Sequence, residues 1–383
     1  MKQDRAAAAD VVVIGGGAIG LSVAWQACVR GLRALVLERD RVGRGTSWHA
    51  AGMIAPVSEV RPGEEPLLEL GLRSAQAYPS FVASLLADAG VDGVGYERCG
   101  TLFVARDGDE AEALERERAL RDRYHLAVER LRPSEARRRE PALAPALRLA
   151  LDLADDHAID PRALCEALAG AVRGRGGEVR EGVSVASVSS AAGRVTGVTL
   201  ADGSRVACER VVVAAGTWTG ALEGAGDPIP VSPIKGQIMR LHDPAGPGLV
   251  RRVIRMGHAY IVPRGDGRYV IGATSEERGF DTTVTAGAAF ALLREAGELV
   301  PAVSELVIDE FTAGLRPGTP DNLPAIGPGS LDGLIWAVGH RRGGILLAPV
   351  TAELVVGLLA GDPADPALQS VAPSRFAGSV VAA

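Results

Sequence analysis

Three glycines near the start of the chain, together with a following glutamate, have the types and spacing to bind a dinucleotide. Gly15, Gly17 and Gly20 fit G-x-G-x-x-G, and Glu38 follows them. The first glycine permits a tight turn, the second lets a pyrophosphate approach the backbone, and the third lets a helix pack closely on a strand. A carboxylate such as that of Glu38 can accept hydrogen bonds from a ribose diol. The alternative is a glycine-rich turn in any doubly wound protein.

The residues around these glycines predict the elements that such a site needs. Val11 to Ile14 are an apolar run typical of a strand buried on both faces. Apolar residues then recur at helical spacing from 21 to 28, where the helix N-terminus would present free N–H groups to phosphate. Residues 34–37 form a second apolar run that ends at Glu38. Because strand, helix, second strand and acid are in register, dinucleotide binding is favoured over an ordinary turn.

Length and composition limit the class of protein. A chain of 383 residues suits two domains, and its net charge of −6 gives no electrostatic reason to expect nucleic acid as a partner. Its 4 cysteines are scattered, so we expect neither a disulfide framework nor a metal site, and a reducing cytoplasm fits. The most apolar stretch, 345–361, contains Pro349 and Glu353, which favours a buried helix over a membrane span.

Periodicity and turn signals predict further elements of an α/β chain. Helices are expected at 67–86, with a kink or break at Pro79, at 109–124, from Asp160 to about 173, and at 285–299. Strands are expected at 100–105, 178–180, 183–188, 194–200, 205–207, 211–215, 235–241, 260–263, 269–273 and 334–338.

The segment from Asp40 to Pro56 is rich in small and hydroxylated residues. Thr46 and Ser47 can donate hydrogen bonds to phosphate, and the small residues 50–52 leave room for a flat ring. Composition alone nevertheless favours an ordinary surface loop here.

Several stretches together resemble the FAD-dependent D-amino acid oxidase family, most closely its glycine oxidase branch. They are Ile14 to Gly20, Ala50 to Met53, Tyr260 to Arg264, Ala313 to Thr319, and Gly339 to Pro349. The resemblance implies an FAD-binding, Rossmann-like domain of the glutathione-reductase type, made of residues 1–78, 151–224 and 313–383. It also implies a second, α+β substrate domain built on an antiparallel sheet, made of residues 79–150 and 225–312.

The resemblance makes FAD the bound nucleotide, held without a covalent link. The residues that it implies for FAD binding are Gly15, Gly17, Ala18, Ile19, Gly20, Glu38, Arg39, Thr46, Ser47, Ala51, Gly52, Met53, Val185, Gly216, His340, Arg341, Arg342, Gly343, Gly344, Ile345 and Leu346. His340 is expected to approach the flavin only through its backbone. Gly343 and Gly344 precede the apolar stretch, so a helix N-terminus there could stabilise the negative charge of a reduced flavin.

Arg316, between Leu315 and Pro317, is the main candidate for binding substrate. A guanidinium matches a carboxylate with two hydrogen bonds and keeps its charge at any working pH. The alternative is a structural arginine held by an acid. The resemblance implies that Arg316 binds the substrate carboxylate, that Tyr260 supports it, and that Arg342 lies beside substrate and flavin. The sequence does not say which of Arg341 and Arg342 points inward.

Other pocket residues are implied less specifically. Met53 is expected at the pocket, and His258 matches a histidine near it, although a partly exposed structural histidine is equally plausible. Ser275 stands where the family has a methionine after Gly-Ala-Thr, so a larger or more polar substrate could fit. Trp48 and His49 are bulkier than the small residues expected there.

The resemblance implies oxidative deamination of glycine and other small amines or D-amino acids, such as sarcosine and D-alanine. Hydride would pass from Cα to flavin N5, and oxygen would reoxidise the flavin to give hydrogen peroxide. The imine would hydrolyse to a 2-oxo acid and ammonia; in this branch it can also feed thiazole synthesis for thiamine. We expect a small amino acid and oxygen as partners, and a homo-oligomer such as a tetramer.

Two alternatives stay open at this point. The first is a D-amino acid or D-hydroxyproline dehydrogenase that passes electrons to another acceptor. The second is a nucleotide-binding module without turnover, which the presence of Arg316, Tyr260 and Arg342 argues against. A nicotinamide dehydrogenase is disfavoured further, because a single glycine motif leaves no second dinucleotide site.

Overall fold

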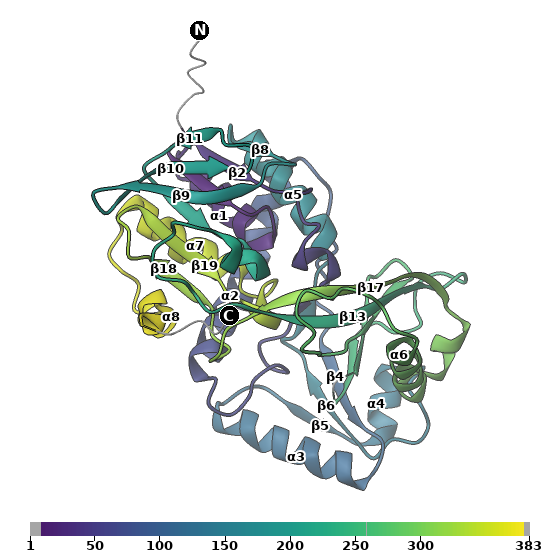
Figure 1. Cartoon of the computed structure of the whole chain (residues 1–383). Helices are drawn as coiled ribbons and strands as arrows, with labels where there is room; N and C mark the ends of the chain where they lie inside the picture. The colour runs from purple at the N-terminus through teal and green to yellow at the C-terminus, as the bar shows by residue number, and fades with distance from the viewer. Residues whose placement is uncertain (1–8, 258, 379–383) are drawn as a thin grey trace.

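The apolar run before the glycine turn forms β1 (Val11–Ile14), near the middle of a six-stranded sheet (Figure 1). The structure is a computed structural model that describes residues 9–257 and 259–378. The order of strands in this sheet is β18 (Ala325–Pro328), β19 (Leu334–Val338), β12 (Val211–Val213), β1, β2 (Ala34–Leu37) and β8 (Glu178–Arg180). All neighbours are parallel except β18 and β19.

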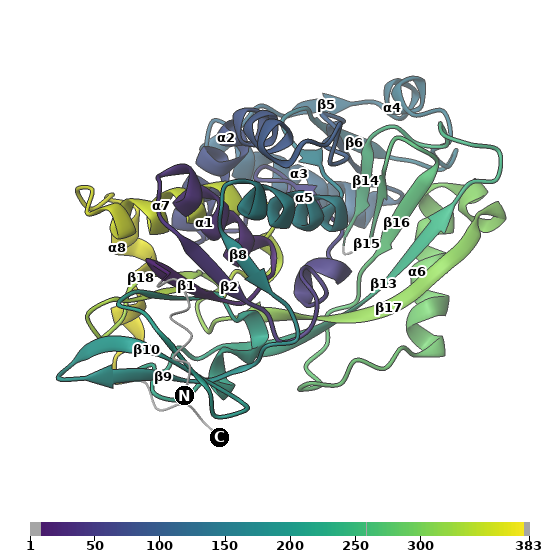
Figure 2. The ribbon, with the colours of Figure 1, turned by 90° about the horizontal axis from the view of Figure 1, so that it is seen from above.

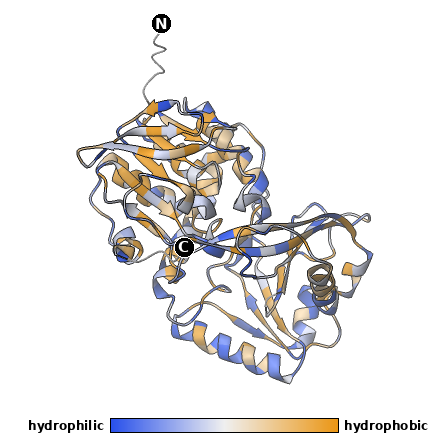
Figure 3. Ribbon diagram, in the orientation of Figure 1, coloured by the Kyte–Doolittle hydropathy of each residue, from blue (hydrophilic) through white to orange (hydrophobic). Residues whose placement is uncertain are grey.

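Both faces of this sheet are covered, as the apolar runs predicted. Val11 and Val13 pack in a core with helices, whereas Val12 and Ile14 pack in another core with a small antiparallel sheet. Figure 2 shows the helices and the small sheet on opposite sides, and Figure 3 shows the apolar strands between them. The helices are α1 (Ala18–Val29), α2 (Glu65–Ala89), α5 (Pro161–Gly174) and α7 (Ala348–Ala360). The small sheet contains β9 (Val185–Ala191), β10 (Arg194–Leu200) and β11 (Arg205–Ala207).

A second lobe is built on an eight-stranded sheet, which is antiparallel except for one parallel pair, β4 with β14. Its order is β17 (Val307–Gly318), β13 (Ser232–His242), β16 (Arg268–Gly272), β15 (Ala259–Pro263), β14 (Val253–Met256), β4 (Thr101–Ala105), β6 (Leu149–Leu153) and β5 (Glu129–Leu131). The long pair β13 and β17 runs from this lobe to the first (Figure 1).

The remaining elements are short or lie outside these sheets. They are β3 (Met53–Ile54), which pairs with β7 (His157–Ala158), and the helices α3 (Gly108–Arg123), α4 (Pro133–Arg139), α6 (Ala286–Leu299) and α8 (Leu368–Val371). The charged face of α3 is visible in Figure 3. Among the described residues, no helix combines the length and apolar character needed to cross a bilayer.

Two expected helix boundaries are wrong. The break at Pro79 does not occur, because α2 continues through the exposed proline. The buried side chains of Tyr78, Phe81 and Leu85 on the opposite face outweigh the lost backbone hydrogen bond. The last helix begins at Ala348 rather than directly after Gly344, with Pro349 in its first turn, where a missing N–H costs nothing.

Most of the other expected elements are confirmed to within a few residues. Asp160 caps α5 as predicted, because its carboxylate accepts hydrogen bonds from the backbone N–H groups of Arg162 and Ala163. The division into an FAD-binding and a substrate domain stays a proposal, and α2 runs across its first boundary, between residues 78 and 79.

Candidate active site

A cavity of about 820 Å³ reaches from the glycine turn after β1 to the strands of the second sheet. It is lined by every residue expected to bind FAD or substrate except two. Gly20 is buried behind the turn, and His258 lies outside the described residues. The six-stranded sheet therefore supplies one end of the cavity and β13 to β17 the other.

The glycine turn has the close contacts that its sequence predicted. Gly15 has a φ of +110°, and a Cβ there would lie 2.4 Å from the Ala214 carbonyl oxygen. A Cβ on Gly20 would lie 2.0 Å from the Gly15 carbonyl oxygen, so α1 can pack here only without a side chain. Gly17 lines the cavity at the start of α1, where N–H groups lack intrahelical partners. This backbone fits a pyrophosphate.

Glu38 lies at the end of β2, and its carboxylate also organises the turn. Oε2 accepts a hydrogen bond from the Gly16 amide at 2.7 Å, and Oε1 accepts one from the Asp40 amide at 3.0 Å. Farther along this wall, the Arg39 guanidinium lies 3.7 Å from the ring centroid of Trp218, and both side chains line the cavity. Amide groups, a carboxylate and an aromatic ring together suit the pyrophosphate, ribose and base of FAD.

The segment after Glu38 is a cavity wall, so the composition-based prediction of a surface loop is wrong. Residues 46–49 form a 3-10 helix, in which Ser47 Oγ accepts a hydrogen bond from the Ala18 amide at 3.0 Å. Thr46 Oγ1 donates to the Leu315 carbonyl at 2.7 Å. This bond ties the wall to β17 directly beside Arg316.

Arg316 lies on β17 and has no carboxylate partner among residues 9–257 and 259–378. Its Nη1 donates to the carbonyl oxygens of Thr274 at 3.1 Å and Lys235 at 3.5 Å. The guanidinium lies over Gly236, where a Cβ would be 2.3 Å from Nη1. It makes no ion pair with any residue that the structure describes, so an arginine held by an acid is not what is found.

Tyr260 lies on β15 and lines the same end of the cavity. Its ring covers Gly272 on β16, where a Cβ would be 2.5 Å from the phenol oxygen. Burial raises the pKa of Tyr260, and nearby Arg316 only partly offsets this. The phenol therefore stays protonated near neutral pH and is available as a hydrogen-bond donor. Ser275 follows Thr274 and is exposed at the cavity wall.

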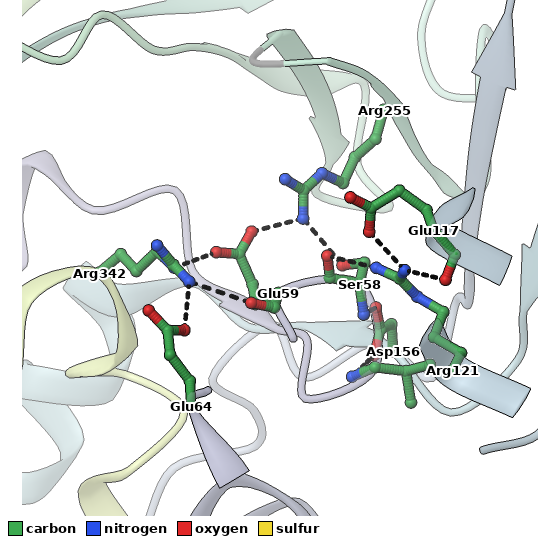
Figure 4. A network of polar contacts seen from close by, with 9 residues as sticks. Ser58, Glu59, Glu64, Glu117, Arg121, Asp156, Arg255 and Arg342 are labelled. Carbon is green, nitrogen blue, oxygen red and sulfur yellow. Dashed lines mark hydrogen bonds and ion pairs between the residues drawn. The ribbon is translucent and has the colours of Figure 1, made fainter. Parts of the chain in front are cut away.

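Arg342 has a different environment, which Figure 4 shows. Its Nε forms an ion pair with Glu59 at 2.5 Å, and its Nη2 forms one with Glu64 at 3.1 Å. Glu59 is also paired with Arg255, whose Nη1 donates to Ser58 Oγ at 2.9 Å. Burial raises the pKa of Glu59, but Arg255 and Arg342 outweigh it, so the pKa lies below its usual value.

A second layer of polar groups holds the backbone at Ser58 and Glu59. The Asp156 carboxylate accepts hydrogen bonds from the Val57 and Ser58 amides, each at 2.8 Å. Burial raises the pKa of Asp156 to about 6. The buried Arg121 side chain donates to the Ser58 carbonyl at 3.0 Å (Figure 4). Glu59 is thus placed by the backbone rather than by its own rotamers.

The comparisons with known proteins agree with this geometry. Residues 10–358 match the family model described as DAO, FAD dependent oxidoreductase.

The chain belongs to this DAO family of FAD-dependent oxidoreductases.

Individual relatives support the same assignment. The chain is 35% identical over 355 residues to a glycine oxidase of Pseudomonas putida, covering 92% of this chain and 94% of that protein. It is 37% identical over 376 residues to the bifunctional protein ThiO/ThiG of Synechocystis sp., covering 96% of this chain and 54% of that protein. The chain therefore spans about half the length of the first curated relatives that it matches. The crystal structure of glycine oxidase from Geobacillus kaustophilus is similar, with a TM-score of 0.89, 32% identity, and coverage of 96% of this chain and 98% of that one.

Within this DAO-family oxidoreductase, His340 and Arg341 precede Arg342 at the cavity. The His340 imidazole is buried, with Nε2 lying 3.0 Å from Thr351 Oγ1 on α7. Burial lowers the pKa of His340 to about 3, so the ring is neutral. The side chain thus points into the fold, which fits the expectation that only its backbone approaches the flavin.

Trp48 and His49, the two bulky residues after Ser47 in the oxidoreductase, are accommodated by specific contacts, and of the two only His49 lines the cavity. The Trp48 ring centroid lies 3.5 Å from the guanidinium carbons of both Arg44 and Arg162. His49 packs against Gly314 on β17, where a Cβ would lie 2.4 Å from the His49 Cβ. Burial lowers the pKa of His49 to about 4, with a further contribution from Arg240. Both side chains therefore fill space beside the strand that carries Arg316.

Sequence reasoning missed Glu59, Glu64 and Arg255. Glu59 and Glu64 belong to one short charged segment and Arg255 to another far along the chain, and no motif in the sequence relates them to Arg342. Only the folded chain brings them together around Arg342, from the segment before α2 and from β14.

Proposed function

We propose that this protein oxidises the Cα–N bond of glycine and other small amines or D-amino acids, such as sarcosine and D-alanine. The products would be an imine or 2-oxo acid, ammonia (methylamine from sarcosine) and, with oxygen as acceptor, hydrogen peroxide. The single observation that carries the proposal is the Arg316 guanidinium, which lines an FAD-family cavity and has no carboxylate partner among the described residues.

The substrate would complete the environment of Arg316. A half-buried cation whose chain partners are only carbonyl groups has unused donors and uncompensated charge. An amino acid carboxylate satisfies the donors, because it accepts two parallel hydrogen bonds from the guanidinium, and its negative charge compensates the positive one. The protonated phenol of Tyr260 would donate to the same carboxylate, and the two groups together would fix the orientation of Cα.

The chain's own part in the reaction is binding and orientation. When bound, FAD would supply the oxidising power by accepting a hydride from the substrate Cα. Tyr260 is unsuited to act as a base, because its raised pKa keeps the proton on the phenol. Holding the substrate in one orientation inside the cavity lowers the entropic part of the barrier. The site therefore needs a substrate whose amine is already neutral.

Anaerobic mixing of the FAD-loaded protein with glycine, sarcosine, D-alanine and L-alanine tests the proposal. We expect the flavin absorbance to bleach with the first three substrates and to change far less with L-alanine. Admission of air should then restore the absorbance and release hydrogen peroxide. A flavin that no amine bleaches would refute the proposal. Bleaching without peroxide would refute oxygen as the acceptor while leaving amine oxidation intact.

Two further expectations stay predictions. A homo-oligomer such as a tetramer can be checked by light scattering of the purified holoprotein. A cytoplasmic location can be checked by fractionation of the native host.

A further inference from the structure

Three consecutive residues at the cavity, His340, Arg341 and Arg342, differ in how their side chains are satisfied. His340 is bonded to Thr351, and Arg342 is paired with Glu59 and Glu64. Arg341 lines the cavity, but its guanidinium makes no hydrogen bond or ion pair with any residue that the structure describes. Its φ of +38° is one that a residue with a side chain rarely adopts. Such conformations persist where the surrounding structure holds them, often at ligand sites.

Positive charge exceeds negative charge at this end of the cavity. The arginines that line it are Arg61, Arg255, Arg316, Arg341 and Arg342, and the acids are Glu59, Glu64 and, on α6, Glu295. Glu59 and Glu64 are already paired with Arg255 and Arg342, and Glu295 lies 4.0 Å from Arg294. Burial lowers the pKa of Arg341, and the charges of Arg342 and Arg61 lower it further; Glu64 offsets this only in part, and Arg316 adds a smaller lowering. The Arg341 guanidinium thus lies in a field that an anion would relieve.

A substrate with one carboxylate cannot balance this field. The proposed function assigns that carboxylate to Arg316, which leaves Arg341 without a counter-ion. The wall beside Arg316 carries a small polar side chain, because Ser275, exposed at the cavity, directly follows Thr274, whose carbonyl accepts a hydrogen bond from Arg316.

We propose that Arg341 forms a second anion subsite, so that the preferred substrates are amino or imino acids with a second carboxylate on the side chain or on the nitrogen. This inference rests on the proposed function, because it names the substrate class of the same site. Arg316 would bind the carboxylate next to the reacting carbon, and Arg341 would bind the distal one. Arg341 is then a specificity-determining residue rather than part of the reacting centre.

Matched substrate pairs test the proposal in steady-state kinetics. D-Aspartate is compared with D-alanine, and iminodiacetate with sarcosine, in the wild type and in Arg341→Leu. We expect kcat/KM for the two diacids to fall about 10- to 100-fold in the variant, since one charge-assisted contact is lost. Any loss for the two monoacids should be at least about 10-fold smaller than the loss for the matched diacids, so the diacid-to-monoacid ratio of kcat/KM falls in the variant. Arg341→Lys should restore much of the diacid activity, because it keeps the positive charge.

A surface variant controls for the loss of one charge. Arg138 is exposed on α4, and Arg138→Leu removes the same charge away from the cavity wall. This variant should treat diacids and monoacids as the wild type does. An equal loss for diacids and monoacids in Arg341→Leu would overturn the subsite, since it would mean that Arg341 serves the cofactor or the fold.

Binding without turnover separates this inference from the proposed function. Succinate and acetate are titrated into the FAD-loaded protein, and binding is followed by calorimetry. Succinate should bind more tightly than acetate, and Arg341→Leu should remove most of that difference. If no amine bleaches the flavin, the proposed function fails whatever succinate does. If monoacids bleach it but neither diacid turnover nor succinate binding depends on Arg341, only the subsite fails.

Discussion

Arg316 on β17 and Arg342 on the turn after β19 line one cavity but lie in contrasting surroundings. Arg316 has carbonyl partners only, whereas Arg342 has two carboxylates, one of which it shares with Arg255. A buried cation with its own counter-ions is complete without a ligand, and removing it would take a partner from each of those anions. A buried cation without counter-ions gains one only when an anionic ligand binds. Residue type and proximity to the cavity therefore do not by themselves assign a role.

The largest effect is expected from Arg316→Ala. We expect kcat/KM for D-alanine to fall about 100- to 4,000-fold, since loss of a charge partner for a buried carboxylate costs about 3–5 kcal/mol. The free energy of unfolding should change by less than about 1 kcal/mol, because no carboxylate that the structure describes loses a partner. The kcat/KM of Arg316→Lys should lie between the values of the wild type and of Arg316→Ala. If the rate of anaerobic flavin reduction were unchanged, Arg316 would not be a substrate ligand, and it would not differ in role from Arg342.

Arg342→Met should affect stability more than turnover, the opposite of Arg316→Ala. We expect the free energy of unfolding, measured by urea denaturation of the holoprotein, to fall by about 3 kcal/mol, because Glu59 and Glu64 lose a buried partner. In a double-mutant cycle, Glu59→Gln should cost less in the Arg342→Met background than in the wild type. Full stability with a selective loss of turnover would instead make Arg342 a substrate ligand, as the sequence first suggested.

Gly236→Ala sharpens the comparison without removing either arginine. The added Cβ would lie 2.3 Å from Arg316 Nη1 and must displace the guanidinium. We expect kcat/KM to fall about 10- to 100-fold, because small displacements of a positioning group are costly in catalysis. Gly297→Ala on α6 is the control, because its Cβ would meet nothing within 4 Å. If Gly236→Ala had the kcat/KM of the wild type, the position of the Arg316 guanidinium over Gly236 would not matter for turnover.

The smallest effect concerns His340, which turns away from both arginines. Its pKa is about 3 in the folded protein, below the ordinary value of 6.5, so the unfolded chain binds the proton more readily. Above pH 6.5 the imidazole is neutral in both states, and the full stability of the folded protein is present. As the pH falls from 6.5 toward 3, the proton binds the unfolded chain preferentially, and the folded protein loses stability. His340→Gln should therefore lose about 2 kcal/mol less stability than the wild type between pH 7 and pH 5, as measured by urea denaturation at both pH values. Identical pH dependence in the two proteins would contradict the buried, neutral imidazole.

Local patterns predicted the parts of the fold that are governed by neighbours in the chain. Val11 to Ile14 alternate between two cores, Gly15 takes a positive φ, and Asp160 caps α5, as their sequence context required. The failures occurred where tertiary contacts overrode local preference. Pro79 remains inside α2, and the segment after Glu38 is a cavity wall because Thr46 and Ser47 bond to β17 and α1.

The sequence by itself determined which residues could do chemistry: a glycine turn for a dinucleotide, and arginines able to bind a carboxylate. Motif spacing determined this, because backbone geometry within a turn or strand depends on adjacent residues. Only the tertiary structure decided that Glu59 and Glu64 neutralise Arg342 while no described part of the chain supplies a counter-ion to Arg316 or Arg341. Charge pairing depends on distances across the fold, since electrostatic energy falls with separation in space and not with separation along the chain.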